Sequence, residues 1–251
     1  MRGWALTTLL SLAMLAMVGC AAPGSGPVAE PEARPSACAD AEGCRVVTRV
    51  DVDGDDRADE VGFVVESKKR ATLRLATSGG QTLRHRLRVT WFPEPEFFGA
   101  APIDGRPGAE LVVGTTMGAH TLFFSTLSVR DGEIVRVPAP AGPEWMIDGA
   151  FAFHAGVVRR VDDGRVTVVL RDAARQGQSS RFAGSDRTYV WRYGGWRHLR
   201  TERTRYRTEE AASRIGGWHV PGLPRRPDFS SPTSGQAPRG AAKVLTATTP
   251  A

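Results

Sequence analysis

Apolar and polar residues alternate along much of the chain, whereas helical periodicity is rare. One stretch shows this plainly, with apolar residues on one side and arginines on the other: Leu83, Leu87, Val89 and Trp91 against Arg84, Arg86 and Arg88. A period of two is typical of a β-strand that buries one face. The pattern therefore predicts an all-β fold built from antiparallel strands.

Hairpin turns recur between the apolar runs. Asp131-Gly132, Asp163-Gly164 and Gly194-Gly195 are spaced by 32 and 31 residues, and another turn surrounds Gly79-Gly80. These dipeptides supply the positive φ that two-residue hairpins need. We therefore predict a propeller-like array of about four antiparallel, blade-like repeats of roughly 35–50 residues each.

One short helix is predicted near the C-terminal end of the folded part. Thr208 can accept a hydrogen bond as the N-cap, and acidic residues fill the first turn of the segment 209–215. Gly216 follows this segment and is expected to end the helix.

The first residues indicate export. Arg2 precedes the uncharged, apolar stretch 4–18, which is too short for a transmembrane helix. We interpret 1–19 as a lipoprotein signal peptide, because 17–20 (Met-Val-Gly-Cys) resembles a lipobox in which Cys20 is acylated. The protein is then anchored to the outer face of the cell membrane. The alternative is cleavage after Ala22 and a free secreted protein.

The chain has three cysteines, an odd number for an exported protein. If Cys20 carries lipid, Cys38 and Cys44 remain as a pair, and we expect them to form a disulfide outside the cell. Spacing alone does not establish this bond. Its short loop makes its stabilisation small, about 2 kcal/mol.

Composition divides the mature chain into three parts. Residues 20–37 form a Pro/Gly-rich tether, 38–221 the folded domain, and 222–251 a disordered tail rich in Pro, Ser, Thr and Gly. The formal charge of +6 includes Arg2 and comes largely from arginine. It indicates an anionic surface, such as phospholipid headgroups or wall polymer, or else a gene that encodes arginine in place of lysine. No nucleic-acid partner is expected.

The densest candidate chemistry is an acidic loop. Asp51, Asp53, Asp55 and Asp59 occupy positions 1, 3, 5 and 9 of nine residues. Ca²⁺ takes six to eight oxygen ligands, so these four carboxylates predict a calcium site. A surface turn without metal is the alternative, although four repelling acids are not needed for a turn. Asp56 stands at a sharp bend, where Asp tolerates a left-handed conformation.

This loop and its following strand, 51–65, resemble an FG-GAP or VCBS-type repeat, the calcium-binding element of integrin-like β-propellers. The resemblance places the four aspartates on ligand positions, and Arg57 where a main-chain carbonyl binds the ion. Residues 99–114 resemble a degenerate second copy, which keeps Asp104 and has Glu110 where the last Asp belongs. The remaining chain is similar in style to actinobacterial lipoproteins that carry one such repeat.

Two rival calcium motifs are rejected. EF-hand and dockerin loops need an acid at position 12 and helical flanks. This chain has Gly62 at that position, and the strand-like segment 61–65 follows the loop.

The turn at Gly194-Gly195 carries a candidate ligand surface. A two-residue turn there pairs Tyr193 with Trp196 and Trp191 with His198. These aromatic residues, beside Arg192 and Arg197, form a platform of the kind that stacks on sugars. The alternative is that the stripe is the core face of the last repeat, as such stripes usually are.

No catalytic constellation is visible in the sequence. The five histidines lack metal-ligand spacing, and no nucleophile elbow or phosphate loop is present. We therefore expect a calcium-stabilised binding or scaffold module at the cell surface, with a protein or glycan ligand. A cell-surface hydrolase is the alternative.

Overall fold

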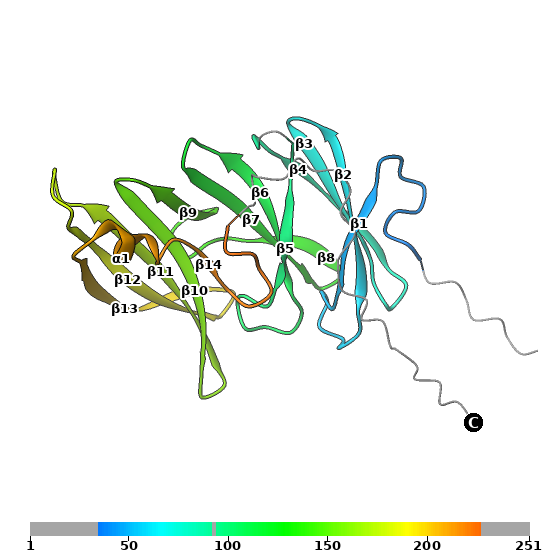
Figure 1. Ribbon diagram of the computed structural model, residues 1–251. Coiled ribbons are helices and arrows are strands. Elements are labelled where there is room, and N and C mark those ends of the chain that lie inside the picture. Colours follow the sequence, from blue (N-terminus) through cyan, green and yellow to red (C-terminus); the bar gives the residue numbers. More distant parts are fainter. Residues whose placement is uncertain (1–34, 92–93, 227–251) are drawn as a thin grey trace, which may run out of the picture. The chain divides into compact units, whose positions relative to one another are not determined.

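The computed structural model describes residues 35–91 and 94–226. This part of the chain is all-β, with antiparallel sheets and one short helix, as the alternation predicted (Figure 1). None of its helices is long and apolar enough to cross a membrane. The predicted signal peptide, Cys20, nearly all of the tether, and residues 227–251 lie outside the described residues.

The first sheet is a four-stranded meander in which every strand pairs with its neighbour in sequence. Its strands are β1 (Arg45–Val50), β2 (Asp59–Ser67), β3 (Arg70–Ala76) and β4 (Thr82–Arg88). In β4 the exposed positions are Arg84, Arg86 and Arg88, and Leu87 is buried. The hairpin predicted around Gly79-Gly80 joins β3 to β4.

The second sheet contains two further meanders joined through one strand. The first of them is β5 (Phe97–Ala101), β6 (Glu110–Met117), β7 (Thr121–Arg130) and β8 (Glu133–Val137). The next is β9 (Trp145–Ala150), β10 (Phe153–Asp162), β11 (Arg165–Arg175), β12 (Phe182–Arg192) and β13 (Gly195–Tyr206). Strand β7 pairs with β9 over its first residues and with β8 over its last ones.

The strands therefore group into three meanders, not about four units. The evenly spaced turns misled the count, because Asp163-Gly164 and the turn near Gly194 both lie in the third meander. Its strands β10 to β13 are 10 to 12 residues long. One hairpin of such strands consumes about as much chain as a turn-to-turn interval, so the spacing did not report whole repeats.

The second meander is packed between the other two. Residues 111, 113, 127 and 129 lie in one core cluster with the first meander, including Leu73 and Phe63. Val112 and Phe124 alternate with them and lie in the other cluster, with Trp145 and Val157 of the third meander. Each neighbouring residue thus serves the opposite core, as the pleat of a strand requires.

The chain end returns across the third meander. Helix α1 (Glu209–Ser213) begins at Thr208, whose Oγ1 accepts a hydrogen bond from Ala211 N, so the predicted cap is confirmed. Strand β14 (Gly217–His219) then pairs in parallel with β10. Packing continues beyond the predicted boundary at Pro221, since Leu223 contacts the core shared by the second and third meanders.

Three hairpins share one turn geometry, which corrects the predicted register of the last. Positive φ occurs at Asp131 and Gly132, at Asp163 and Gly164, and at Tyr193 and Gly194. The turn residues of the last hairpin are therefore Tyr193-Gly194, one position earlier than predicted. Trp191 consequently pairs with Trp196, and Tyr189 pairs with His198. The turn needs glycine at its second position, so Gly194 fits there while Tyr193 takes the first left-handed position.

Candidate metal centre

The acidic loop connects the paired ends of β1 and β2. Val50 lies opposite Asp59, so the eight intervening residues form a closed loop at the edge of the first meander. Gly54 and Asp56 have positive φ, at 86° and 62°. The left-handed conformation expected for Asp56 is therefore present.

Three of the four predicted aspartates converge in this loop. Asp51, Asp53 and Asp59 each offer a carboxylate oxygen, and these oxygens lie within 4.8 Å of one another. Asp59 is buried, Asp51 is half-buried, and Asp53 is exposed. Such a group of oxygens on one loop is a chemically suitable partial shell for a hard dication.

Backbone amides hold these carboxylates in place. Asp51 accepts hydrogen bonds from Gly54 N at 2.7 Å and from Asp56 N at 3.0 Å. Asp59 accepts from Val52 N at 2.8 Å and from Ser78 N at 2.7 Å. The loop conformation and the carboxylate directions are therefore fixed together.

Asp55 is directed elsewhere. Its carboxylate accepts hydrogen bonds from the Ser78 hydroxyl at 2.6 Å and from Arg57 N at 2.8 Å. The bond from Ser78, followed by that from the Arg57 amide, lowers the pKa of Asp55. The sequence did not reveal Ser78, which comes from the β3–β4 loop and meets both Asp55 and Asp59.

The pKa of Asp53 moves the other way. Burial, followed by repulsion from Asp59 and Asp55, raises it. A carboxylate crowded by other carboxylates in this way is stabilised in its charged form by a cation. The electrostatics of the loop are thus those of a site that gains from binding positive charge.

The degenerate second copy has the same local geometry, 51 residues further along the chain. Ala101 lies opposite Glu110 as Val50 lies opposite Asp59. Ile103 N donates to Glu110 Oε2 at 2.5 Å, in the place of the bond from Val52 N to Asp59. The predicted internal repeat is therefore present at the level of strand register and loop hydrogen bonds in these two copies.

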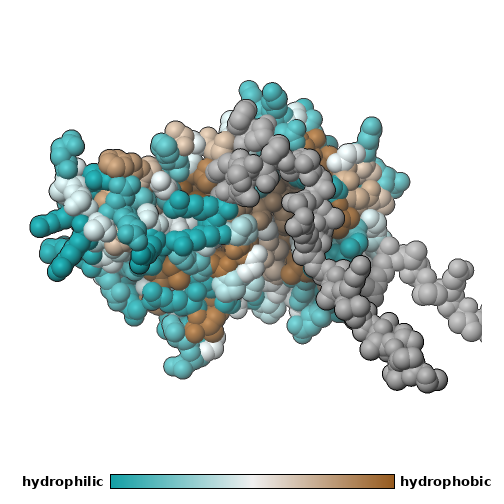
Figure 2. Space-filling view, in the orientation of Figure 1, coloured by the Kyte–Doolittle hydropathy of each residue, from teal (hydrophilic) through white to brown (hydrophobic). Residues whose placement is uncertain are grey.

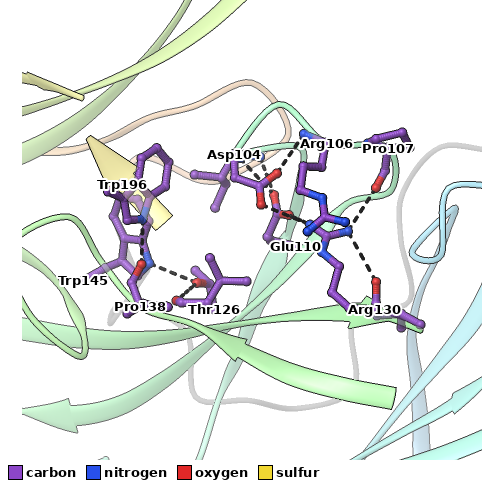
Figure 3. A network of polar contacts seen from close by, with 12 residues as sticks. Asp104, Arg106, Pro107, Glu110, Thr126, Arg130, Pro138, Trp145 and Trp196 are labelled. Carbon is purple, nitrogen blue, oxygen red and sulfur yellow. Dashed lines mark hydrogen bonds and ion pairs between the residues drawn. The ribbon is translucent and has the colours of Figure 1, made fainter. Parts of the chain in front are cut away.

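In the second copy an arginine contacts the acids that remain (Figure 3). Arg130 Nη2 lies 3.0 Å from Asp104 Oδ2 and 3.1 Å from Glu110 Oε1, and both carboxylate side chains are fully buried. Burial, followed by repulsion from Asp104, raises the pKa of Glu110 to about 7. Arg130 ends β7, 20 residues from Glu110 in sequence, so no local pattern identified it.

The two loops touch each other. Ala109 N donates to the Asp51 carbonyl oxygen at 2.9 Å. A Cβ atom on Gly54 would lie 2.6 Å from Pro107 Cβ, and one on Gly108 would lie 2.6 Å from the Val52 carbonyl oxygen. Both glycines are therefore required by the close approach, and the second loop supports the candidate metal loop from outside.

The predicted aromatic platform is divided between core and surface. Trp196 and Trp191 stack edge to face, with centroids 5.2 Å apart, and Trp196 also stacks on the buried Trp145 at 5.8 Å. Trp196 Nε1 donates to the Pro138 carbonyl oxygen at 2.7 Å (Figure 3). These two tryptophans join the core cluster, as the alternative interpretation held. Tyr193, Arg192 and Arg197 are exposed.

The Sγ atoms of Cys38 and Cys44 are 2.07 Å apart, at disulfide distance. They lie against Gly62 on β2, where a Cβ atom would come within 3.0 Å of both sulfurs. Arg74 adds a bond from its Nε to the Ala37 carbonyl oxygen, at 2.6 Å. The short cysteine loop is thus packed onto the first meander.

A cavity of about 530 Å³ lies between the 139–146 segment and strands β10 to β12. It contains the carboxylates of Glu144 and Asp172. The former accepts the Thr115 hydroxyl bond at 2.6 Å, and the latter bonds Ser185 and Arg187. Both acids in this cavity therefore already have partners within the protein.

Comparison of the chain with models of protein families, with curated proteins and with solved structures found no match. The functional argument therefore rests on the residues and geometry described above.

Proposed function

We propose that this chain is a lipid-anchored, extracytoplasmic binding or scaffold module whose β domain is stabilised by Ca²⁺. The observation that carries the proposal is the convergence of Asp51, Asp53 and Asp59 within 4.8 Å on a loop closed by two strands. The similarity of this loop to FG-GAP and VCBS-type repeats supports calcium as the ion. In the proposal the Arg57 carbonyl and water complete the coordination, and Asp55 joins if it leaves Ser78.

We also infer that the three meanders are consecutive blades of a propeller-like array. The 51-residue equivalence of the first two meanders and their face-to-face packing support this inference. An experimental structure in which the third meander packs by a different relation from the first two would contradict it.

The test of the calcium site is thermal unfolding with added Ca²⁺ and with chelator. Exported calcium modules have dissociation constants of about 10⁻⁴ to 10⁻³ M. Calcium at 100 times that constant stabilises the native state by about 2.7 kcal/mol. We expect chelator to lower the melting temperature of the native protein. Asp53→Ala is expected to abolish the calcium response.

Asp162→Ala is the matched control, since it removes an exposed aspartate of β10 far from the cluster in sequence. It should keep the full calcium response. An unchanged native melting temperature in chelator would refute a structural calcium site. An undiminished response in Asp53→Ala would place the ion elsewhere.

A further inference from the structure

Strand β13 is an edge of the ten-stranded sheet and carries an unusual concentration of charge. Among the described strands it pairs only with β12. Residues 192–207 contain six arginines and one acid, Glu202, which gives +5, while the whole 251-residue chain carries +6. Most of its side chains are exposed, and hydrophilic residues cover this end of the domain (Figure 2).

Four of these arginines have no carboxylate partner among the described residues: Arg192, Arg197, Arg203 and Arg205. Within the same segment only Arg200 is paired, with Glu202 at 3.0 Å. Their guanidinium groups are therefore available to an external anion. Arginine suits this role because its planar group donates two parallel hydrogen bonds to phosphate or carboxylate.

Two exposed apolar side chains lie within this basic strand. Tyr193 occupies the hairpin tip and is 93% exposed. Leu199 is 43% exposed and is the extra residue of a bulge, since Arg200 pairs with Thr188 while His198 pairs with Tyr189. A bulge re-aims the chain locally, and this one leaves Leu199 outside the core.

Strand β4 provides a comparison, because it is also a basic sheet edge. Its arginines alternate with Leu83 and the buried Leu87, so one of its faces serves the core. The large apolar residues that the described part exposes lie elsewhere: Val46, Phe151, Val161, Tyr193 and Leu199. Charges protect sheet edges from aggregation, which accounts for β4. Edge protection does not account for Tyr193 and Leu199 beside the arginines of β13.

We propose that β13 and its turn dock on a membrane surface rich in anionic phospholipid headgroups. Arginines near such a surface are attracted by its negative potential, and tyrosine favours the headgroup level because one end of its ring is apolar and the other polar. Twelve residues of extended strand span about 40 Å, which suits a flat surface. This deepens the proposed function by giving the anchored module a contact with the membrane that is separate from its lipid.

The test uses the full chain with Cys20→Ser, so the result does not depend on lipidation. Flotation is measured with vesicles of phosphatidylcholine alone and with vesicles that also contain phosphatidylglycerol. We expect stronger binding to the anionic vesicles, and we expect added salt to remove the difference because it screens exposed charges. Any contribution from the apolar stretch 4–18 is common to all variants.

The decisive variant replaces Arg192, Arg197, Arg203 and Arg205 with Gln. Each basic residue near an anionic surface contributes about fivefold in affinity, so the loss is expected to reach about a hundredfold or more. The matched control replaces Lys68, Lys69, Arg84 and Arg88, which are exposed cations of the first meander, with Gln. It should bind almost as the parent does. Equal losses in the two variants would overturn the proposal, because they would indicate attraction by total charge.

Tyr193→Asn distinguishes a membrane from a soluble polyanion, since Asn tolerates the left-handed turn. It should weaken vesicle binding severalfold and leave any heparin binding unchanged. Heparin binding as strong as vesicle binding, together with no effect of Tyr193→Asn on vesicles, would refute the membrane. Equal binding of the parent to neutral and anionic vesicles would also refute it, whatever the variants do, while failure of the chelator test alone would affect only the calcium site.

Discussion

Arg130 is predicted to be essential for the stability of the second loop. Arg130→Met removes the only guanidinium that contacts the buried side chains of Asp104 and Glu110 in the described structure. Arg130 is itself only 13% exposed, so water compensates little. Removing one partner of a buried ion pair costs about 3–5 kcal/mol, because the other charge stays buried without compensation. We expect a loss of this size at pH 8.

The loss should depend on pH. The pKa of Glu110 is raised from 4.5 to about 7 in the folded protein. Below this pH the buried Glu110 is protonated, and it then needs no cation. The destabilisation by Arg130→Met is therefore expected to be smaller at pH 5 than at pH 8. Urea unfolding at both pH values measures it.

Two variants serve as controls. Arg86→Met removes an exposed arginine, 3.8 Å from Glu66, and should cost no more than about 1 kcal/mol. Glu110→Gln keeps an oxygen to accept the Ile103 N bond but cannot ionise. In the native protein the folded carboxyl keeps its proton to a higher pH than the unfolded one. Its contribution to stability is thus full below pH 4.5 and lost as the pH rises to about 7. Glu110→Gln should lack this fall. Equal effects of Arg130→Met and Arg86→Met, or a loss that is the same at both pH values, would refute the reasoning.

Three further outcomes are expected. Cys20→Ser should release the protein from the membrane fraction or stop its maturation, and a native protein without acyl mass in mass spectrometry would contradict the lipid anchor. Alkylation of the unreduced mature protein should find no free thiol, because Cys38 and Cys44 lie at disulfide distance, and two labelled thiols would disprove the bond. Asp56→Gly should raise the free energy of unfolding by about 1 kcal/mol, because it relieves a left-handed φ of 62° while keeping the amide that bonds Asp51. A decrease measured by urea unfolding would mean that the Asp56 side chain contributes more than the backbone conformation costs.

Local patterns predicted local structure well. The period-two alternation gave the β-strands, the cap at Thr208 gave the helix, and the turn dipeptides Asp131-Gly132 and Asp163-Gly164 fall in turns. The same evidence failed where the answer depended on chain length between turns, which led to four repeats in place of three meanders. It also failed by one residue at Gly194, because Tyr is a rare occupant of a left-handed position.

The candidate site was only partly visible for a related reason. The acids of the loop are adjacent in sequence, so their convergence was predictable. Ser78 and Arg130 reach the two loops from other hairpins, 19 residues from Asp59 and 20 from Glu110. Contacts of that kind depend on how strands pair, and no spacing rule within one loop reports them.

The position of Trp218 has a consequence for biosynthesis. Its ring lies 5.5 Å from that of Phe124 and 5.6 Å from that of Trp145, and it is 2% exposed, at the centre of the core between the second and third meanders. It comes from β14, the last strand described. While the chain leaves the ribosome, the first meander has all four of its strands early, but this larger core stays open until residue 218 has been made. The nascent protein therefore carries exposed aromatic surface through most of its synthesis, which makes it a substrate for chaperones until its last strand is in place.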